Sequence, residues 1–241
     1  MSADGAGTLP FNSEPFNSAL PFDSALARRL RRAEGVDLAG SIYAVPAPDR
    51  SAAARSLAER QAWVHADVFA DADRGVSLDL IVALAGDGVG PIDVHLLTAD
   101  ALAALDAVCR PGITRITVPF EGVADVGAVA GRIRASGVRP WLAISPGTPL
   151  SRCADALAHV DGLLVMLLEP GDQGSSDLTL LAKVAEARER LPVGVDGGIG
   201  DADLTQVLAA GASYVVVGRQ LFRTPPTTSG GPAHNRSDDD R

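Results

Sequence analysis

Three observations predict an α/β fold, a single (β/α)8 TIM barrel that forms one domain between tails expected to be disordered. Between residues 39 and 223, short β-branched or apolar runs alternate with Ala-rich runs of helical periodicity. Eight strand candidates occur in this strict alternation, which is the pattern of a barrel of parallel strands. Apolar residues make up 46% of the chain but aromatic residues only 4%, as is typical of buried parallel strands packed against small-residue helices.

The predicted elements follow one another along the chain in pairs. The strands are expected at Ser41–Ala44, Ala62–Val68, Ile92–Leu97, Ile113–Val118, Pro140–Ile144, Gly162–Leu167, Pro192–Val195 and Tyr214–Val217. The helices are expected to include Ser51–Gln61, Ala99–Ala107, Val123–Ala135, Ser151–Ala158, Leu178–Leu191 and Asp201–Ala210. A doubly wound parallel sheet is the alternative, but such a sheet more often has a glycine-rich turn after its first strand, and residues 41–46 contain no glycine.

Both ends of the chain have the composition of tails. Residues 1–38 contain a short repeat that begins at Pro10, Pro15 and Pro21, and they are expected to form a flexible extension. The other interpretation is a docking segment whose phenylalanines bind a partner. The arginine run at 28–32 predicts the exposed face of a short helix. Residues 224–241 are polar and contain Pro and Gly, so a disordered tail is expected there.

Charge and composition narrow the class of partner. The formal net charge is −9 and no basic patch extends beyond the arginine run, so we expect no nucleic-acid partner. No stretch of about 18 apolar residues is present, so no membrane span is expected. The N-terminus lacks a secretory signal, and two cysteines far apart in sequence suggest no disulfide framework. A cytoplasmic location is the resulting expectation.

Polar residues at the carboxyl ends of the predicted strands indicate chemistry, because active sites of barrel enzymes lie there. His65 and Asp67 are two apart and therefore share a strand face. His95 ends the third strand and Asp196 follows the seventh. Two imidazoles and two carboxylates are a mixed donor set for one divalent ion: Zn, Fe, Mn or Co. A lone strand histidine is more often an ordinary hydrogen-bonded residue, and we assign that role to His159 and His234.

Glycines after the last strands indicate a phosphate site. Gly197 and Gly198 follow the seventh strand, and Gly218 follows the eighth, where barrel folds commonly bind phosphate through backbone N–H groups. Arg219 either pairs with that phosphate or faces solvent. Gly171, after the sixth strand, belongs to a stretch that either supplies further amides or forms a lid; taken singly, each glycine is only a turn signal.

Over residues 40–222 the sequence resembles the ribulose-phosphate 3-epimerase family. The matching motifs are His65-x-Asp67-Val68, Asp93-Val-His95-Leu-Leu97, Ser145-Pro-Gly-Thr-Pro149, Val165-Met166 followed by Pro170-Gly171, Val195-Asp-Gly-Gly-Ile199 and Val217-Gly218. The resemblance implies that the four ligand-type residues bind a divalent metal and that Asp67 and Asp196 form the acid–base pair. It also implies that Ser41 lies near the substrate and that Met166 lines the site.

The implied activity is the epimerisation of carbon 3 of a phosphorylated ketose, most simply D-ribulose 5-phosphate to D-xylulose 5-phosphate in the pentose phosphate pathway. The chain departs from the family pattern around the site. Residues 69–75 replace the usual loop after the second strand, and Pro119, Glu169 and Arg219 stand where the family usually has His, Asn and Ser. These changes leave the ketose open.

Two other functions are compatible with the same barrel. One is a homologue that binds metal or sugar phosphate in a regulatory or assembly role. The other is a lyase or decarboxylase; a Schiff-base lyase needs a lysine on a barrel strand, and the single lysine, Lys183, lies in a predicted helix. The expected partner is a sugar-phosphate substrate. The metal, and whether the chain forms a homo-oligomer, are left open.

Overall fold

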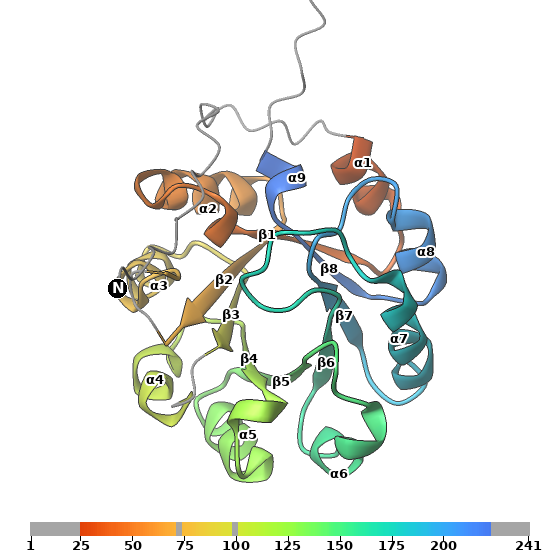
Figure 1. Ribbon diagram of the computed structural model, residues 1–241. Helices are drawn as coiled ribbons and strands as arrows, with labels where there is room; N and C mark the ends of the chain where they lie inside the picture. The colour runs from red at the N-terminus through yellow and green to blue at the C-terminus, as the bar shows by residue number, and fades with distance from the viewer. Residues whose placement is uncertain (1–24, 71–73, 98–100, 223–241) are drawn as a thin grey trace, which may run out of the picture.

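Eight parallel strands close into a barrel in the chain order β1 to β8, and helices surround it (Figure 1). This computed structural model describes residues 25–70, 74–97 and 101–222. The predicted (β/α)8 barrel is therefore confirmed, and the doubly wound sheet is excluded because β1 pairs with both β2 and β8. The expected tail at 224–241 and most of the N-terminal repeat region lie outside the described residues.

The elements have the following bounds. The strands are β1 (Asp37–Ser41), β2 (Trp63–Phe69), β3 (Ile92–Leu97), β4 (Arg115–Pro119), β5 (Arg139–Ile144), β6 (Gly162–Met166), β7 (Val193–Asp196) and β8 (Tyr214–Val217). The helices are α1 (Ala25–Arg32), α2 (Arg50–Glu59), α3 (Leu78–Gly86), α4 (Ala101–Val108), α5 (Val126–Ala135), α6 (Ala154–Leu157), α7 (Leu181–Ala187), α8 (Leu204–Ala209) and α9 (Arg219–Phe222).

The first strand begins earlier than the sequence predicts. The strand expected at Ser41–Ala44 is Asp37–Ser41, and Ile42–Ala44 forms a 3-10 turn instead. The cause is pairing, because residues 37–40 lie in register with the four residues of β8. Helix α3 was not among the expected helices; the Ser77 hydroxyl accepts a hydrogen bond from the Leu80 N–H at its start, which is a typical N-cap.

The segment expected to be a flexible extension is in part packed on the barrel. Helix α1 buries Leu26 and Leu30, which are four residues apart and therefore share a face. Arg29 on the same helix bonds the Asp201 carboxylate at 3.0 Å, which places α1 beside α8 (Figure 1). The described residues 25–38 thus belong to the folded body, because they carry an apolar stripe that the arginine run obscured. The expected short helix with exposed arginines is correct.

The interior of the barrel differs from the shell between strands and helices. Its apolar side chains form a separate cluster: Ala39, Trp63, Trp141, Ala143, Leu164, Met166, Tyr214 and Val216. The large rings fit because two neighbouring strands, β6 and β7, carry glycines. A Cβ at Gly162 would collide with the Trp141 ring, and one at Gly194 would lie 2.8 Å from the Tyr214 ring. Bulky aromatics thus fill the part of the barrel away from the carboxyl ends of the strands.

None of the helices in the described ranges is both long enough and apolar enough to span a bilayer.

Candidate metal centre

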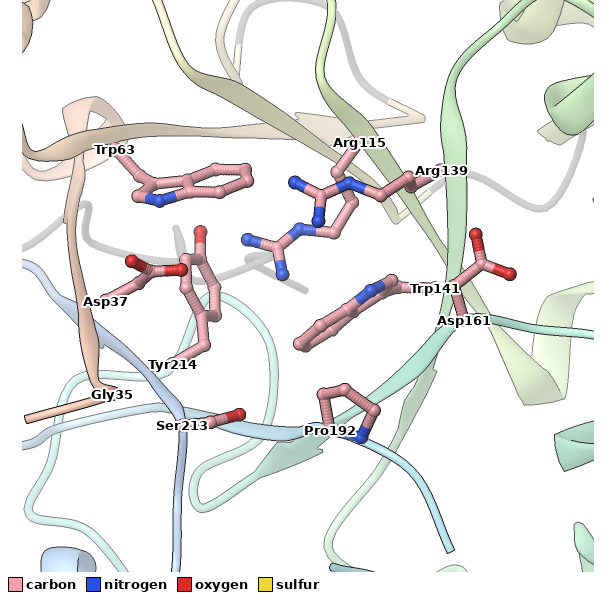
Figure 2. A pocket seen from close by; sticks show the side chains of 10 residues that line it. All are labelled: Gly35, Asp37, Trp63, Arg115, Arg139, Trp141, Asp161, Pro192, Ser213 and Tyr214. Atoms are coloured by element: carbon pink, nitrogen blue, oxygen red, sulfur yellow. The ribbon is translucent and has the colours of Figure 1, made fainter.

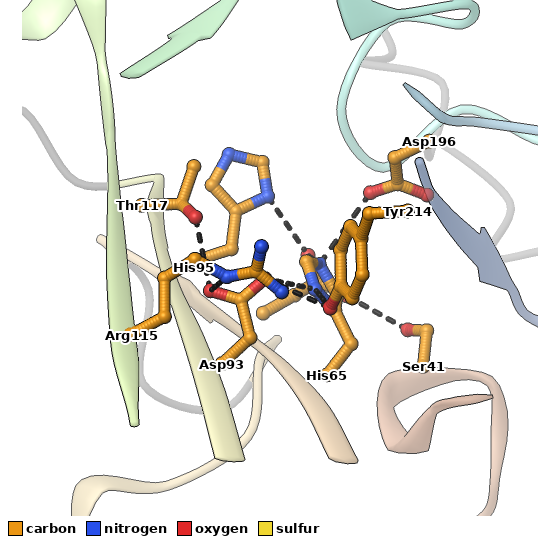
Figure 3. Close-up of polar contacts among 9 residues, drawn as sticks. Ser41, His65, Asp93, His95, Arg115, Thr117, Asp196 and Tyr214 are labelled. Carbon is orange, nitrogen blue, oxygen red and sulfur yellow. Dashed lines mark hydrogen bonds and ion pairs between the residues drawn. The ribbon is translucent and has the colours of Figure 1, made fainter. Parts of the chain in front are cut away.

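Four ligand-type side chains meet at the carboxyl ends of β2, β3 and β7. One donor atom from each of His65, Asp67, His95 and Asp196 lies within 4.8 Å of the other three. The register explains the meeting, because His65 lies opposite Asp93 and Asp67 lies opposite His95 in the β2–β3 pair. Asp196 ends β7. The structure therefore brings together all four residues that the sequence analysis proposed as ligands (Figure 3).

The two imidazoles present different nitrogens to this cluster. His65 Nε2 lies 3.2 Å from Asp67 Oδ1 and 3.5 Å from Asp196 Oδ2. His95 instead presents Nδ1, at 3.3 Å from Asp67 Oδ1. Both rings are fully buried, and among the described residues neither ring nitrogen of His95 has a hydrogen-bond partner. A buried imidazole without a partner costs free energy unless something outside the chain binds it.

The charges of the cluster also favour the binding of a cation. Burial lowers the pKa of His65, but Asp67, Tyr214 and Asp196 together outweigh burial and raise the pKa well above 6.5. Burial raises the pKa of Asp67, yet His65 and His95 lower it overall. Without a metal, a proton on His65 therefore compensates the carboxylates. Two imidazole nitrogens and two carboxylates fit a divalent ion, which would replace that proton.

Ser41 contacts the cluster directly. Its hydroxyl donates a hydrogen bond of 2.8 Å to Asp67 Oδ2. Because Asp67 Oδ1 faces both histidines, the serine occupies the second oxygen and fixes the orientation of the carboxylate. Ser41 was expected near the substrate; the contact that the structure gives it is with the proposed acid–base residue.

A second polar layer lies beneath the cluster and was not predicted. Asp93 Oδ2 lies 3.0 Å from His65 Nδ1 and accepts from the Tyr214 hydroxyl at 2.9 Å. Asp93 Oδ1 accepts from the Thr117 hydroxyl at 2.9 Å and lies 3.3 Å from Arg115 Nε. Burial raises the pKa of Asp93, but Arg115 and His65 lower it overall. The available signal was spacing, because Asp93 lies two residues before His95 on the same strand face.

The glycines after β7 lie against the loop between β6 and α7, residues 167–177, which crosses the barrel opening in Figure 1. Gly198 has φ +69°, and a Cβ there would lie 2.7 Å from the Ser176 nitrogen. Gly197 has φ +115° and contacts Leu168. Gly218 is more open, since among the described residues its Cβ would meet one atom within 4 Å, the Ala44 Cβ at 3.3 Å. Arg219 is exposed and donates a hydrogen bond of 3.3 Å to Gln173 Oε1, so its side chain lies against this loop.

The remaining predicted residues lie on different sides of the opening. Met166 is buried in the barrel interior and pairs in register with Asp196. Gly171 packs against Arg74 and Phe69, on the side of β2. His159 lies in the turn before β6, away from the cluster, and its carbonyl accepts from Arg134.

The fold and the cluster together define a (β/α)8 protein with a candidate metal centre at the carboxyl ends of its strands. A model of the ribulose-phosphate 3 epimerase family matches residues 39–222, so the chain belongs to that family and is an isomerase of the epimerase class.

Relatives with the same description cover most of the barrel. The ribulose-phosphate 3-epimerase of Mycobacterium tuberculosis is 30% identical over 171 residues, which are 66% of this chain and 75% of the relative. Ribulose-phosphate 3-epimerase 2 of Cupriavidus necator is 32% identical over 152 residues, 58% of this chain and 63% of the relative. Among solved structures, a mutant tryptophan synthase alpha-subunit of Pyrococcus furiosus matches with a TM-score of 0.58 at 17% identity, covering 77% of this chain and 88% of that one. That likeness concerns the fold alone.

Proposed function

We propose that this protein epimerises carbon 3 of a phosphorylated ketose, converting D-ribulose 5-phosphate to D-xylulose 5-phosphate. The observation that carries the proposal is the pair of carboxylates, Asp67 and Asp196, at the ends of β2 and β7 with the His65 imidazole between them. The names of the curated relatives support the same reaction. In that reading the protein acts in the pentose phosphate pathway.

The reaction needs an acid and a base on opposite faces of a planar intermediate. The proton at carbon 3 is acidic because it is adjacent to the carbonyl at carbon 2. One aspartate removes it, leaving an enediolate, and the other aspartate returns a proton to the opposite face. Asp67 and Asp196 suit these roles because β8 and β1 separate their strands in the barrel, so a flat substrate can lie between them. Ser41 holds Asp67 in one orientation throughout.

His65, Asp67, His95 and Asp196 would hold the divalent metal. When bound, that ion supplies a Lewis acid that stabilises the negative charge on the enediolate oxygens. The donor set of two nitrogens and two oxygens suits Zn, Fe, Mn or Co. The chain itself contributes the ring of His95, which has no hydrogen bond to any described residue, and the two carboxylates beside it.

The substrate phosphate is proposed to lie over Gly197, Gly198 and Gly218, with Arg219 as its charged partner. Backbone N–H groups after β7 and β8 are the usual phosphate ligands of this fold. Met166, beside Asp196, is proposed to line the sugar subsite. The exposed side chain of Arg219 can turn toward an anion, because its present contacts are with uncharged groups, Gln173 and the carbonyl of Gly174.

A Schiff-base lyase receives no support from the site. Lys183, the single lysine of the chain, donates to the carbonyls of Pro146 and Thr148 at 2.7 and 2.8 Å. It therefore secures the loop after β5 and does not face the metal cluster.

The test is steady-state conversion by the purified protein, after removal of metal and reloading with each of the four candidate ions. D-ribulose 5-phosphate is compared with a panel of other pentulose and hexulose phosphates. We expect conversion only after reloading and the highest kcat/KM with D-ribulose 5-phosphate. A better hexulose phosphate would correct the substrate; no conversion of any ketose by fully loaded protein would overturn the proposal.

A further inference from the structure

We propose that Asp93 is a positioning residue for the metal centre, which holds the His65 ring with Nε2 toward the cluster, and that Arg115 holds Asp93 for this task. The inference deepens the proposed function and rests on the same four-residue site. It concerns a layer of the barrel that lies beneath every residue assigned so far.

The first step is the hydrogen bond between Asp93 and His65. Asp93 is fully buried, and its Oδ2 lies 3.0 Å from His65 Nδ1. A carboxylate can only accept, so Nδ1 must carry the hydrogen. In the neutral ring the lone pair is then on Nε2, the nitrogen that faces Asp67 and Asp196. The contact thus selects both the tautomer and the ring orientation that a metal ligand needs.

The second step is the arrangement that holds Asp93. All four of its neighbours are donors: His65, Tyr214 and Thr117 through hydrogen bonds and Arg115 through an ion pair (Figure 3). An asparagine in its place has one acceptor oxygen and a donating NH2 group, so it cannot satisfy these partners on both sides.

The third step is the confinement of Arg115. Its guanidinium carbon lies 3.8 Å from the ring centre of Tyr214, 3.9 Å from that of Trp141 and 4.3 Å from that of Trp63. Figure 2 shows the guanidinium among these three rings, in a cavity of about 230 Å³ on the side of the barrel away from the metal cluster. Cation–π contacts with three rings restrict the group to one place. The rings therefore fix Arg115, Arg115 fixes Asp93, and Asp93 fixes His65.

His95 provides an internal contrast. Its Nδ1 faces the cluster, and within the described ranges its Nε2 has no hydrogen-bond partner. No carboxylate orients this ring as Asp93 orients His65. A change at Asp93 should therefore alter the state of one of the two imidazoles and leave the other unaffected.

The experiment compares zinc binding in Asp93→Asn and Tyr214→Phe with that of the parent protein. Tyr214→Phe removes one donor from Asp93, and with it a 3.4 Å contact between the hydroxyl and His65 Nδ1, but keeps the ring against Arg115. Asp87→Asn is the matched control, because Asp87 pairs with Arg55 on the surface at 2.6 Å. Zinc affinity is measured by competition with a chelator, without substrate. NMR of nitrogen-labelled histidine, recorded without metal at a pH high enough for His65 to be neutral, reports the tautomers, and circular dichroism reports the fold.

We expect Asp93→Asn to weaken zinc binding by about 10- to 100-fold and to change the tautomer signal of His65 but not that of His95. Tyr214→Phe should weaken zinc binding and change the His65 tautomer signal in the same direction but by a smaller amount. Asp87→Asn should leave zinc binding and the tautomer signal unchanged. In turnover, kcat should fall while KM for the sugar phosphate stays close to the parent value. If Asp93→Asn fails to fold, the zinc affinity and the His65 tautomer of Tyr214→Phe alone decide whether the proposal stands. Parental zinc affinity and an unchanged His65 tautomer in the folded variants would overturn the proposal.

The readouts separate this inference from the proposed function. Weakened zinc binding in a protein that converts no ketose would uphold the positioning role and reject the epimerase. Conversion of ribulose 5-phosphate with normal zinc binding in Asp93→Asn would uphold the epimerase and reject the positioning role.

Discussion

The two polar layers of the barrel interior differ in how completely the chain satisfies them. In the lower layer, Asp93 has four donors around its two oxygens, and Arg115 balances its charge. In the upper layer, His95 has no hydrogen-bond partner among the described residues, and two carboxylates share the imidazole of His65. The carboxylate at the centre of the lower layer is fully satisfied by the chain, and Arg115 beside it is held by an ion pair and three rings; the imidazole of His95 in the upper layer has no such partners.

The difference separates residues that hold the site from residues that perform its chemistry. A buried carboxylate held by three hydrogen bonds and an ion pair is fixed in place, because loss of its counter-ion leaves a buried charge unpaired. The layer above it keeps two negative charges beside imidazole nitrogens, which is the arrangement a divalent cation prefers. Changes in the upper layer should therefore affect metal binding and turnover, and changes in the lower layer should also affect stability.

The largest effect should come from the upper carboxylates. Asp67→Asn and Asp196→Asn should each lower kcat by about 10²- to 10⁴-fold, because each removes one partner of the proton transfer. The double variant should be little worse than either single one, since the pair acts as a unit. The metal content of each variant must be measured in parallel, and Asp87→Asn serves as control. Substantial turnover in either single variant would contradict the two-carboxylate mechanism.

Stability should distinguish the layers. Arg115→Met leaves Asp93 buried without its counter-ion, so the free energy of unfolding should fall by about 3–5 kcal/mol. In the metal-free protein, Asp196→Asn should change it by only about 0.5 kcal/mol, because the Asp196 side chain is partly exposed. Denaturant titrations of both variants give the comparison. Equal losses would show that the upper layer is as much a part of the packing as the lower one.

The pH dependence of the upper layer should depend on the metal. The pKa of His65 is raised in the folded metal-free protein, so its contribution to stability is complete below pH 6.5 and is lost as pH rises through the folded value. Zinc must displace that proton, so zinc affinity should instead increase over the same rise. Thermal midpoints are measured with and without zinc as pH rises from 6.5. The metal-free midpoint tests the loss of stability, and the difference that zinc makes tests the gain in zinc affinity. A metal-free midpoint that does not fall as pH rises would contradict the assignment of the proton to His65.

The smallest effect is expected at the proposed phosphate site. Gly218→Val should raise KM for the sugar phosphate by about 10-fold with little change in kcat, because the side chain obstructs the approach of the anion to the backbone. A Cβ at Gly218 would lie 3.3 Å from the Ala44 Cβ, so circular dichroism and the thermal midpoint must first show that the variant folds. Gly131→Ala on α5 is the control, since no atom of the part of the chain that the structure describes lies within 4 Å of its Cβ position. An unchanged KM would move the phosphate elsewhere.

The sequence predicted the upper layer because two simple rules suffice for it. Side chains two apart on a strand share a face, and barrel sites lie at the carboxyl ends of strands; together they select His65, Asp67, His95 and Asp196. The lower layer depends on register, which aligns Asp93 with Arg115 across β3 and β4 and which no local pattern contains. A buried arginine in a strand becomes interpretable only when its aromatic neighbours from three other strands are known.

The start of the barrel was misjudged for a related reason. Residues 37–41 have the sequence Asp-Leu-Ala-Gly-Ser, which has weak strand propensity. They form β1 because β8 and β2 both pair with them. The packing of helix α1 on the barrel was missed because of its arginines, although Leu26 and Leu30 have the spacing of a buried helical face.

Proton exchange at carbon 3 tests the central claim most directly. The metal-loaded protein is incubated with D-ribulose 5-phosphate in deuterated water, and both the substrate and the xylulose product are analysed by NMR and mass spectrometry. The account predicts deuterium at carbon 3 of the product, lost in Asp67→Asn and Asp196→Asn. Tight binding of the ketose phosphate by loaded protein, with no deuterium at carbon 3 of any ketose tested, would contradict it.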